Sequence, residues 1–202
     1  MTPSPAPDPK AFRRTIGLFA TGVTVVAAHT SDGIIGMTAN AVSSVSLDPL
    51  LVLVCIDHRA RLAGHLIVGL PFSINVLRDD QEVLSRYFAG GWRDRPAPEF
   101  RFEAWDDAPR LVGALAAVRC DVDRLDDGGD HYILVGSVRD LSEGPEPWNP
   151  LIFYAGRYRR LAPPAVPTAP PEEWGPDGVS IYYDEWSAAD RPSRAEAFDP
   201  PK

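Results

Sequence analysis

Small polar side chains gather in residues 36–55, GMTANAVSSVSLDPLLVLVC, directly before an apolar run. Hydroxyls and amides of this size fill strands poorly, and turns need only a few of them. One interpretation is a polar edge strand, a turn at Asp48-Pro49 and then a buried strand. The other is a shallow pocket whose side-chain and backbone donors face a planar polar ligand. The residues concerned are Thr38, Asn40, Ser43, Ser44 and Ser46.

Two arginines follow the apolar run. In Cys55-Ile-Asp-His-Arg-Ala-Arg61 a strand-like segment leads into polar residues at the expected beginning of a helix. Helix N-termini and guanidinium groups both favour phosphate. A solvated strand end accounts for the same residues without any ligand, so both interpretations stay open.

A histidine lies at the beginning of another expected strand. In Gly128-Gly-Asp-His-Tyr-Ile-Leu-Val-Gly136 a glycine turn places His131 at the first strand position. Ligands commonly meet barrels at strand mouths. A histidine that only stabilises the turn is the alternative.

Several common catalytic motifs are missing from the sequence. It contains neither GxGxxG nor GxxxxGK[ST], so a bound nucleotide would be held without those phosphate loops. HExxH, GxSxG and clusters of His, Cys and Asp at metal-ligand spacing are also missing. Cys55 and Cys120 fit no CxxC pattern and are expected to be buried free thiols. We therefore expect no metal site and no hydrolytic chemistry.

Charge and hydropathy narrow the class of protein further. The 202 residues carry a net charge of −8, and no basic stripe with interleaved aromatics occurs. This pattern argues against nucleic acid as the main partner. No apolar run reaches the ~18 residues of a membrane span, and the N-terminus MTPSPAPDPK does not resemble a signal peptide. The sequence predicts a soluble, cytoplasmic protein without membrane contact.

Proline marks the expected domain boundaries. Four prolines lie in residues 1–9 and nine in residues 161–202, against eight in the long middle. We predict an extended arm over residues 1–8, a folded domain over residues 9–160 and an acidic, proline-rich tail over residues 161–202. Within the tail, Val179 to Trp186 is apolar enough to dock on its own domain or on a second subunit.

Periodicity within the domain favours short strands over long helices. Asp8-Pro9 is typical of a helix start, and this helix is expected to end near Thr21-Gly22. Asp79 and Glu82 are spaced as a capping box for another helix, which Gly90-Gly91 would end. A third helix is expected over residues 58–67. Strands are expected over residues 23–30, 34–43, 50–57, 72–77, 112–124, 131–141 and 151–158. Without an alternating βαβ rhythm, a closed or split antiparallel barrel is favoured.

These stretches, in this order, resemble the flavin reductase family, which serves two-component monooxygenases. The resemblance rests on FATGVTVV (19–26), GMTANAVSSVSLDPLLVLVCID (36–57), FSINVL with LSRYFAG (72–90), GGDHYILVGSV (128–138) and PLIFYAGRY (150–158). It implies a mainly β, FMN-binding split antiparallel β-barrel with a few short helices, and a homodimer with flavin near the subunit interface. It also implies an NAD(P)H:flavin oxidoreductase that uses NADH or NADPH, with FMN or FAD as flavin, and passes reduced flavin to a partner monooxygenase.

The resemblance also assigns roles to individual residues. Thr38, Ala39 and Asn40 would meet the polar edge of the flavin ring, Cys55 to Asp57 would offer backbone groups, and His131 would place the nicotinamide. Arg59 and Arg61 would approach the phosphate, although many relatives carry Ser or Thr where Arg61 stands. The full set expected to bind cofactor is Met37, Thr38, Ala39, Asn40, Ser43, Ser44, Cys55, Ile56, Asp57, Arg59, Arg61 and Phe88.

Two other functions stay open on the same barrel. One is an oxidoreductase that keeps its flavin and transforms an organic substrate, with the tail covering the pocket. The other is a non-catalytic flavin- or haem-binding barrel. The flavin reductase function itself requires no protein acid or base, because the nicotinamide and the flavin carry out the hydride transfer themselves.

Overall fold

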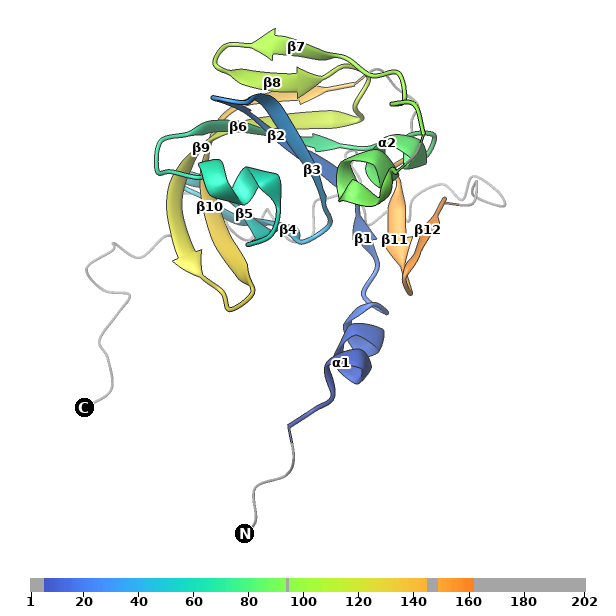
Figure 1. The fold of residues 1–202 in the computed structure, drawn as a ribbon. Helices are drawn as coiled ribbons and strands as arrows, with labels where there is room; N and C mark the ends of the chain where they lie inside the picture. The colour runs from blue at the N-terminus through green and yellow to red at the C-terminus, as the bar shows by residue number, and fades with distance from the viewer. Residues whose placement is uncertain (1–5, 94, 145–148, 162–202) are drawn as a thin grey trace, which may run out of the picture. The chain divides into compact units, whose positions relative to one another are not determined.

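A curled seven-stranded antiparallel sheet dominates the computed structural model, which describes residues 6–93, 95–144 and 149–161 (Figure 1). The sheet order is β3 (Gly33–Ala39), β2 (Thr24–Thr30), β6 (Pro71–Val76), β9 (Ala116–Asp127), β10 (His131–Glu143), β5 (Leu50–Asp57) and β4 (Val42–Leu47). The mainly β, antiparallel fold class is thereby confirmed. The expected tail lies outside the described residues, apart from Leu161.

The two edges of this sheet are joined by only two residues. β3 and β4 are sheet edges, yet Asn40 and Ala41 connect them directly. The sheet must therefore curl until its edges approach, while β3 pairs with β2 and β4 pairs with β5. The single strand expected over residues 34–43 is wrong for this reason, because the chain changes pairing partner at Asn40. The barrel is split at this point.

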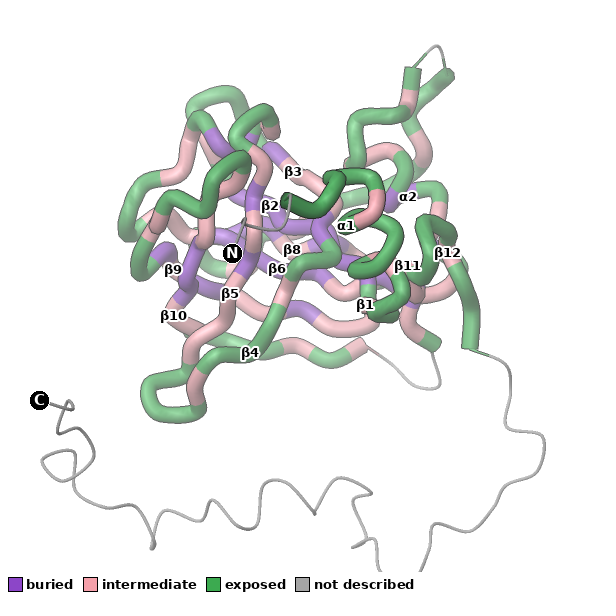
Figure 2. The backbone as a smooth tube through the Cα atoms, turned by 90° about the horizontal axis from the view of Figure 1, so that it is seen from below, coloured by how far each residue is buried: buried purple, intermediate pink, exposed green. Residues whose placement is uncertain are grey.

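The barrel interior is filled by alternate residues of the curled sheet. Val26 and Ala28 of β2 point into this core, whereas Val23 and Val25 pack on the outer face. Both faces of β2 are thus covered, which explains its continuous apolar run. Figure 2 shows buried backbone through β2 and β6 and exposed backbone on β4.

A short 3₁₀-helix, η1 (Arg61–His65), lies beside the split. The helix expected over residues 58–67 is reduced to this one segment, and no side chain caps its beginning at Ala60. Leu62 is fully buried in the barrel core, and η1 contacts β2 and β3. Burial of Leu62 thus fixes η1 against the opening.

An outer layer covers the second face of β2 and β6. It contains two short helical segments, α2 (Glu82–Arg86) and the π-helix η2 (Tyr87–Gly91). A hairpin of β7 (Phe102–Trp105) and β8 (Ala108–Leu111) follows. A small sheet of β1 (Thr21–Gly22), β11 (Ile152–Tyr154) and β12 (Arg157–Arg159) completes the layer. The prediction that Asp79 and Glu82 form a capping box is wrong, because Gln81 and not Asp79 directly precedes the first residue of α2. Gln81 instead accepts a hydrogen bond from the Arg78 amide and donates one to the Gly113 carbonyl, at 2.9 and 3.0 Å.

Turns change two of the strands that the sequence predicted. The strand expected over residues 112–124 begins too early, because residues 112–115 form a turn, with Gly113 at φ 80°, that joins β8 to β9, and only β9 overlaps the expected range. The segment over residues 151–158 becomes β11 and β12 around Ala155 and Gly156, which both have positive φ. Alanine rarely adopts that backbone conformation, so Ala155 gives no turn signal and Gly156 alone marks this turn in the sequence.

The N-terminal helix α1 (Pro9–Ile16) begins where expected. The Asp8 carboxylate accepts a hydrogen bond from the Ala11 amide at 3.2 Å, and Pro9 occupies the first turn. The helix ends at Gly17 rather than near Thr21-Gly22, and none of its residues is buried. Figure 1 shows it extending from the barrel below β1.

Candidate functional site

The candidate residues on β3 offer backbone rather than free side chains to the split. Met37 packs against the barrel core and Ala39 is buried in it. The Thr38 hydroxyl donates to the Ser85 carbonyl at 2.7 Å. As a sheet edge, β3 has no strand partner on the side away from β2 within the described chain. Its unpaired amides and carbonyls are thus the groups available to a ligand.

The β3–β4 connection carries the exposed polar residues of the cluster. Asn40 donates to the Thr21 hydroxyl at 3.2 Å and remains solvent-exposed. Ser43 and Ser44 are exposed on β4. The Cys55 amide donates to the Ala41 carbonyl at 3.0 Å, which ties this connection to β5. The interpretation of the polar run as edge strands that lead through Asp48-Pro49 into β5 is confirmed, whereas the ligand pocket stays a prediction.

The ends of β5 and β10 bring two separate sequence stretches together. Asp57 pairs with His131 in register, and Cys55 pairs with Ile133. The Ile56 side chain is fully buried in the core, so at this position only the backbone faces the site. We use "open end" for this region, comprising residues 37–41, 55–61 and 130–132.

Asp57 and Arg59 form a hydrogen-bonded ion pair at the open end. Asp57 accepts hydrogen bonds from the Arg59 backbone amide at 2.8 Å, from Nε at 3.0 Å and from Nη2 at 2.6 Å. These bonds hold the pKa of the Asp57 carboxyl well below its usual range. The Arg59 charge is thus already matched within the chain.

Arg61 differs from Arg59 because its charge is unmatched. It is the first residue of η1 and is exposed. Among the described residues, no hydrogen bond or ion pair engages its guanidinium group. An exposed guanidinium that no described residue engages is suited to binding a phosphate group.

His131 is held by its neighbour in sequence. Its Nδ1 lies 2.6 Å from the Asp130 Oδ1, and because a carboxylate can only accept, Nδ1 donates. This bond lowers the pKa of the Asp130 carboxyl. Nε2 is thereby left to face a ligand, and the His131 side chain is 40% exposed.

Sequence reasoning missed three residues of this cluster. The His58 amide donates to the Asp130 carbonyl at 3.1 Å, and the His58 ring lies 4.3 Å from the Tyr132 ring. Asp130, His58 and Tyr132 therefore fix the β5 and β10 ends relative to one another. The sequence could have indicated these three residues, because each is the immediate neighbour of a predicted site residue, Asp57 or His131.

Phe88 lies apart from the other candidates, in the outer layer. Its ring covers Gly36, where an added Cβ would come within 2.8 Å of the Phe88 ring. It also packs edge-on against Tyr87, Phe100 and Phe102. These contacts give Phe88 a packing role behind β3.

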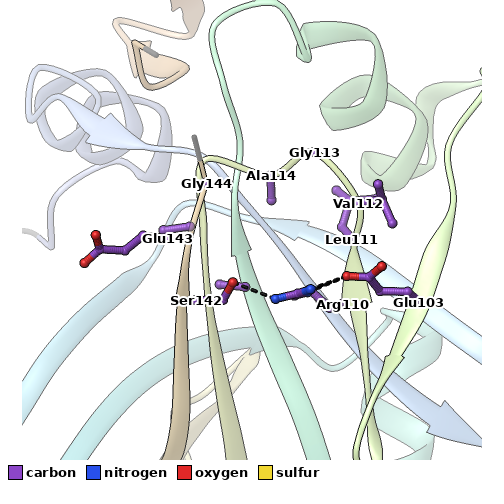
Figure 3. A pocket seen from close by; sticks show the side chains of 11 residues that line it. Glu103, Arg110, Leu111, Val112, Gly113, Ala114, Ser142, Glu143 and Gly144 are labelled. Carbon is purple, nitrogen blue, oxygen red and sulfur yellow. Dashed lines mark hydrogen bonds and ion pairs between the residues drawn. The ribbon is translucent and has the colours of Figure 1, made fainter. Parts of the chain in front are cut away.

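A hollow lies beside β10 at Ser142 and Glu143, and none of the candidate residues lines it (Figure 3). Arg110 forms an ion pair with Glu103 and donates to the Ser142 hydroxyl at 2.6 Å. These bonds clamp the β7–β8 hairpin onto β10, so the hollow has a structural explanation. Within the described parts of the chain, no group of His, Cys, Asp and Glu is arranged to hold a metal.

Fold and site together define a split antiparallel barrel whose open end presents an oriented histidine, together with backbone groups and an arginine that no described residue engages. Residues 16–162 match the flavin reductase like domain. The chain is 40% identical over 156 residues to the reductase component of 4-hydroxyphenylacetate 3-monooxygenase from Thermus thermophilus, covering 77% of this chain and 99% of the relative.

Two solved structures show the same likeness. One is the NADH:FAD oxidoreductase SgcE6 of Streptomyces globisporus in complex with NAD and FAD fragments, with TM-score 0.69, 38% identity, and 81% of this chain and 100% of that chain covered. The other is the styrene monooxygenase flavin reductase of Pseudomonas putida, with TM-score 0.67, 35% identity, and 76% and 98% covered. This chain belongs to the flavin reductase family.

Both described cysteines are free, as predicted. Cys120 is buried, and burial raises the pKa of its thiol to about 12. Cys55 is only half-buried, which corrects the expectation that both thiols are inaccessible. In the described chain, no helix has the length and apolarity to cross a membrane.

Proposed function

We propose that this protein is an NADH-dependent flavin reductase that supplies reduced flavin to a partner monooxygenase. The observation that carries the proposal is the convergence of the β3 edge, Arg61 and His131 at one open end. Relatives named as reductase components of monooxygenases support the partner.

The open end fits a flavin. The polar edge of a flavin ring needs hydrogen-bond donors and acceptors, which the unpaired β3 edge and the Cys55–Asp57 backbone provide. Asn40, Ser43 and Ser44 are exposed beside these groups. Hydride acceptance from a nicotinamide is the chemistry that the flavin supplies when bound.

Arg61, rather than Arg59, is proposed to bind the flavin phosphate. Asp57 already matches the charge of Arg59 through two guanidinium hydrogen bonds. Recruiting Arg59 to a phosphate would require that pair to open, whereas Arg61 is available without rearrangement. We propose FMN as the flavin, with FAD as the alternative. Comparing the rates of NADH oxidation with FMN and with FAD distinguishes the two.

His131 is proposed to contact the nicotinamide. Because Asp130 accepts from Nδ1, a neutral His131 presents Nε2 as an acceptor. The carboxamide N–H groups of a nicotinamide are suitable donors to it. His131 would therefore orient the nicotinamide without exchanging a proton in the chemical step.

The assembly, location and boundaries complete the proposal. We propose a homodimer, supported by exposed apolar residues on β4 and β5, namely Val45, Leu47 and Leu50. Unpaired described thiols are typical of a reducing compartment, which supports the cytoplasm. The domain is proposed to span residues 9–160, between an arm (1–8) and a tail (161–202). The end of the family match at residue 162 and the end of the compact unit at Leu161 support the C-terminal boundary, and the start of α1 at Pro9 supports the N-terminal one.

Oxidation of NADH tests the activity directly. The purified full chain is mixed with NADH and catalytic FMN, and the NADH absorbance is followed, with FAD and NADPH compared in parallel. In air, where dioxygen reoxidises the reduced flavin, multiple turnovers are expected; without oxygen, NADH oxidation is expected to stop once one equivalent of NADH has reduced each FMN. Tight flavin binding without turnover would contradict the proposal.

A further inference from the structure

The outer layer holds the β3 edge at three successive positions. Met37 and Ala39 face the barrel core, so strand alternation turns the even-numbered residues to the other side. Each of these outward positions contacts one element of the outer layer, namely Gly36 with Phe88 of η2, Thr38 with Ser85 of α2, and Asn40 with Thr21 of β1. The outer layer therefore fixes how the β3 edge is rotated about its own axis.

The rotation of this edge matters for a ligand. Within the described chain β3 pairs with β2 alone, and the backbone groups on its other side are those proposed to meet the flavin ring. Hydrogen bonds weaken steeply as the angle at the hydrogen falls toward about 120°. A small rotation of β3 would therefore weaken several bonds to the ring at once, so the contacts that prevent it are contacts that position the flavin.

The contact at Thr38 continues to a third element. The Thr38 hydroxyl donates to the Ser85 carbonyl at 2.7 Å, and the Ser85 hydroxyl oxygen lies 2.8 Å from that of Tyr158 on β12. Ser85 is fully buried, so its hydroxyl requires a partner inside the protein, and among the described residues the Tyr158 hydroxyl is that partner. We call Thr38, Ser85 and Tyr158 the hydroxyl bridge, which runs from β3 through α2 to β12.

Tyr158 is held firmly at the far end of this bridge. Its ring lies 5.4 Å from the ring of Phe153, its partner in the pairing of β11 with β12. The Arg86 guanidinium lies over the Tyr158 ring at 4.8 Å, where cation–π attraction stabilises it. Glu82 in turn accepts two hydrogen bonds from Arg86, at 2.8 and 2.6 Å. The Tyr158 hydroxyl is therefore a fixed point relative to which the β3 edge is placed. Figure 1 shows α2 beside β11 and β12.

We propose that Ser85 and Tyr158 are positioning residues of the flavin site, which act through Thr38 and contact neither the flavin nor the nicotinamide. This inference rests on the flavin reductase function proposed above and adds two residues that lie outside the open end. The hydroxyl bridge directs the β3 backbone groups, so it serves the flavin ring and not the phosphate, which Arg61 is proposed to bind. Its loss should therefore weaken FMN and riboflavin equally, unlike the loss of Arg61.

Tyr158→Phe tests the bridge, because it removes one hydroxyl and keeps the ring that packs against Phe153 and Arg86. The dissociation constants of FMN and riboflavin, measured by fluorescence titration well below the melting temperature, are expected to rise by about 3- to 10-fold, the range for one lost hydrogen bond. The KM for FMN should rise alike, with kcat at saturating FMN unchanged. Tyr154→Phe, which removes an exposed hydroxyl from the same small sheet, is the matched control and should alter neither.

Substitutions at Thr38 test whether the bridge acts as a unit. Thr38→Val removes the hydroxyl at nearly the same shape and should weaken both flavins, whereas Thr38→Ser keeps the hydroxyl and should restore binding. Because both changes break one bridge, Thr38→Val/Tyr158→Phe should bind flavin no more weakly than Thr38→Val alone. Additive losses would place Thr38 in direct contact with the flavin and would contradict the bridge.

The remaining outcomes separate this inference from the proposed function. An unmodified chain that binds no flavin would contradict both. If the unmodified chain binds and reduces flavin, but Tyr158→Phe lowers only the melting temperature, the bridge is structural and this inference alone fails. Weaker FMN binding by Tyr158→Phe with riboflavin unaffected would connect Tyr158 to the phosphate and would likewise overturn it.

Discussion

Asn75 and Asn40 represent two regions that use polar side chains in opposite ways. Asn75, on β6, is fully buried and donates to the Val25 carbonyl at 3.0 Å and to the Ser73 hydroxyl at 2.8 Å. It also accepts from the Leu111 amide at 2.9 Å. Ser73 donates to the Pro109 carbonyl, so these bonds attach the β7–β8 hairpin to the barrel. We call Ser73, Asn75 and their partners the buried polar network.

The open end has the contrasting arrangement. Asn40, Arg59 and Arg61 are exposed there, and Asp57 bonds Arg59 while Asp130 bonds His131, each within two residues in sequence. Such local pairs orient side chains but attach no distant elements. The comparison teaches that a buried polar residue with several satisfied bonds stabilises this fold, whereas an exposed one, such as Asn40 with its single bond to the Thr21 hydroxyl, retains groups for a ligand.

The largest expected effect breaks the buried polar network. Asn75→Leu would leave the Leu111 amide and the Val25 carbonyl without their side-chain partner, at about 1–3 kcal/mol for each buried group. We expect the free energy of unfolding to fall by roughly 3 kcal/mol or more in urea titrations. Asn40→Ala, the matched exposed variant, should change it by less than about 0.5 kcal/mol. Similar losses for both would invalidate the comparison.

The second largest effect is expected for FMN binding, where the two arginines of the open end are compared. Arg61→Ala should weaken FMN binding by roughly 1.5–3 kcal/mol, the range for hydrogen bonds to charged groups, while riboflavin binding stays nearly unchanged. Arg59→Ala is the control and should weaken FMN less, because Asp57 already matches the Arg59 charge. Flavin fluorescence titrations measure both. A larger loss for Arg59→Ala would reverse the assignment.

A kinetic effect is expected at His131. His131→Ala should lower kcat/KM for NADH by about 10- to 100-fold and leave FMN affinity and melting temperature unchanged. His58→Ala, at the neighbouring histidine, should have a much smaller kinetic effect, because its ring already packs, tilted by 56°, against the Tyr132 ring. If His131→Ala lowers the melting temperature and affects both cofactors alike, His131 is a structural residue of the turn.

The smallest effect is the pH dependence of the Asp130–His131 pair. The pKa of Asp130 is lowered in the folded chain, chiefly by its hydrogen bond to His131. Its stabilising contribution is therefore present above the ordinary carboxyl pKa and is lost as pH falls through the lowered folded pKa. Between pH 6 and 3, the melting temperature of Asp130→Asn should fall less steeply than that of the unmodified chain. Parallel curves would show that the pair contributes nothing to stability.

Much of the fold and of the site followed from local patterns. Asp8-Pro9 predicted the start of α1, and the apolar run at residues 50–57 predicted β5 with its bounds. Runs such as GGDHYILV and CIDHRAR identified the segments that meet at the open end. These patterns suffice because capping, turn formation and strand periodicity depend on neighbours in sequence.

Only the tertiary structure decided how those segments combine. It broke the predicted strand over residues 34–43 at Asn40, since a curled sheet forces the chain to change partner there. It placed Phe88 behind β3, and it paired Arg59 with Asp57, whereas Arg61 has no partner among the residues that the structure describes. Pairing across a sheet and charge matching between side chains depend on which residues meet in space, and one-dimensional periodicity carries no information about those distances.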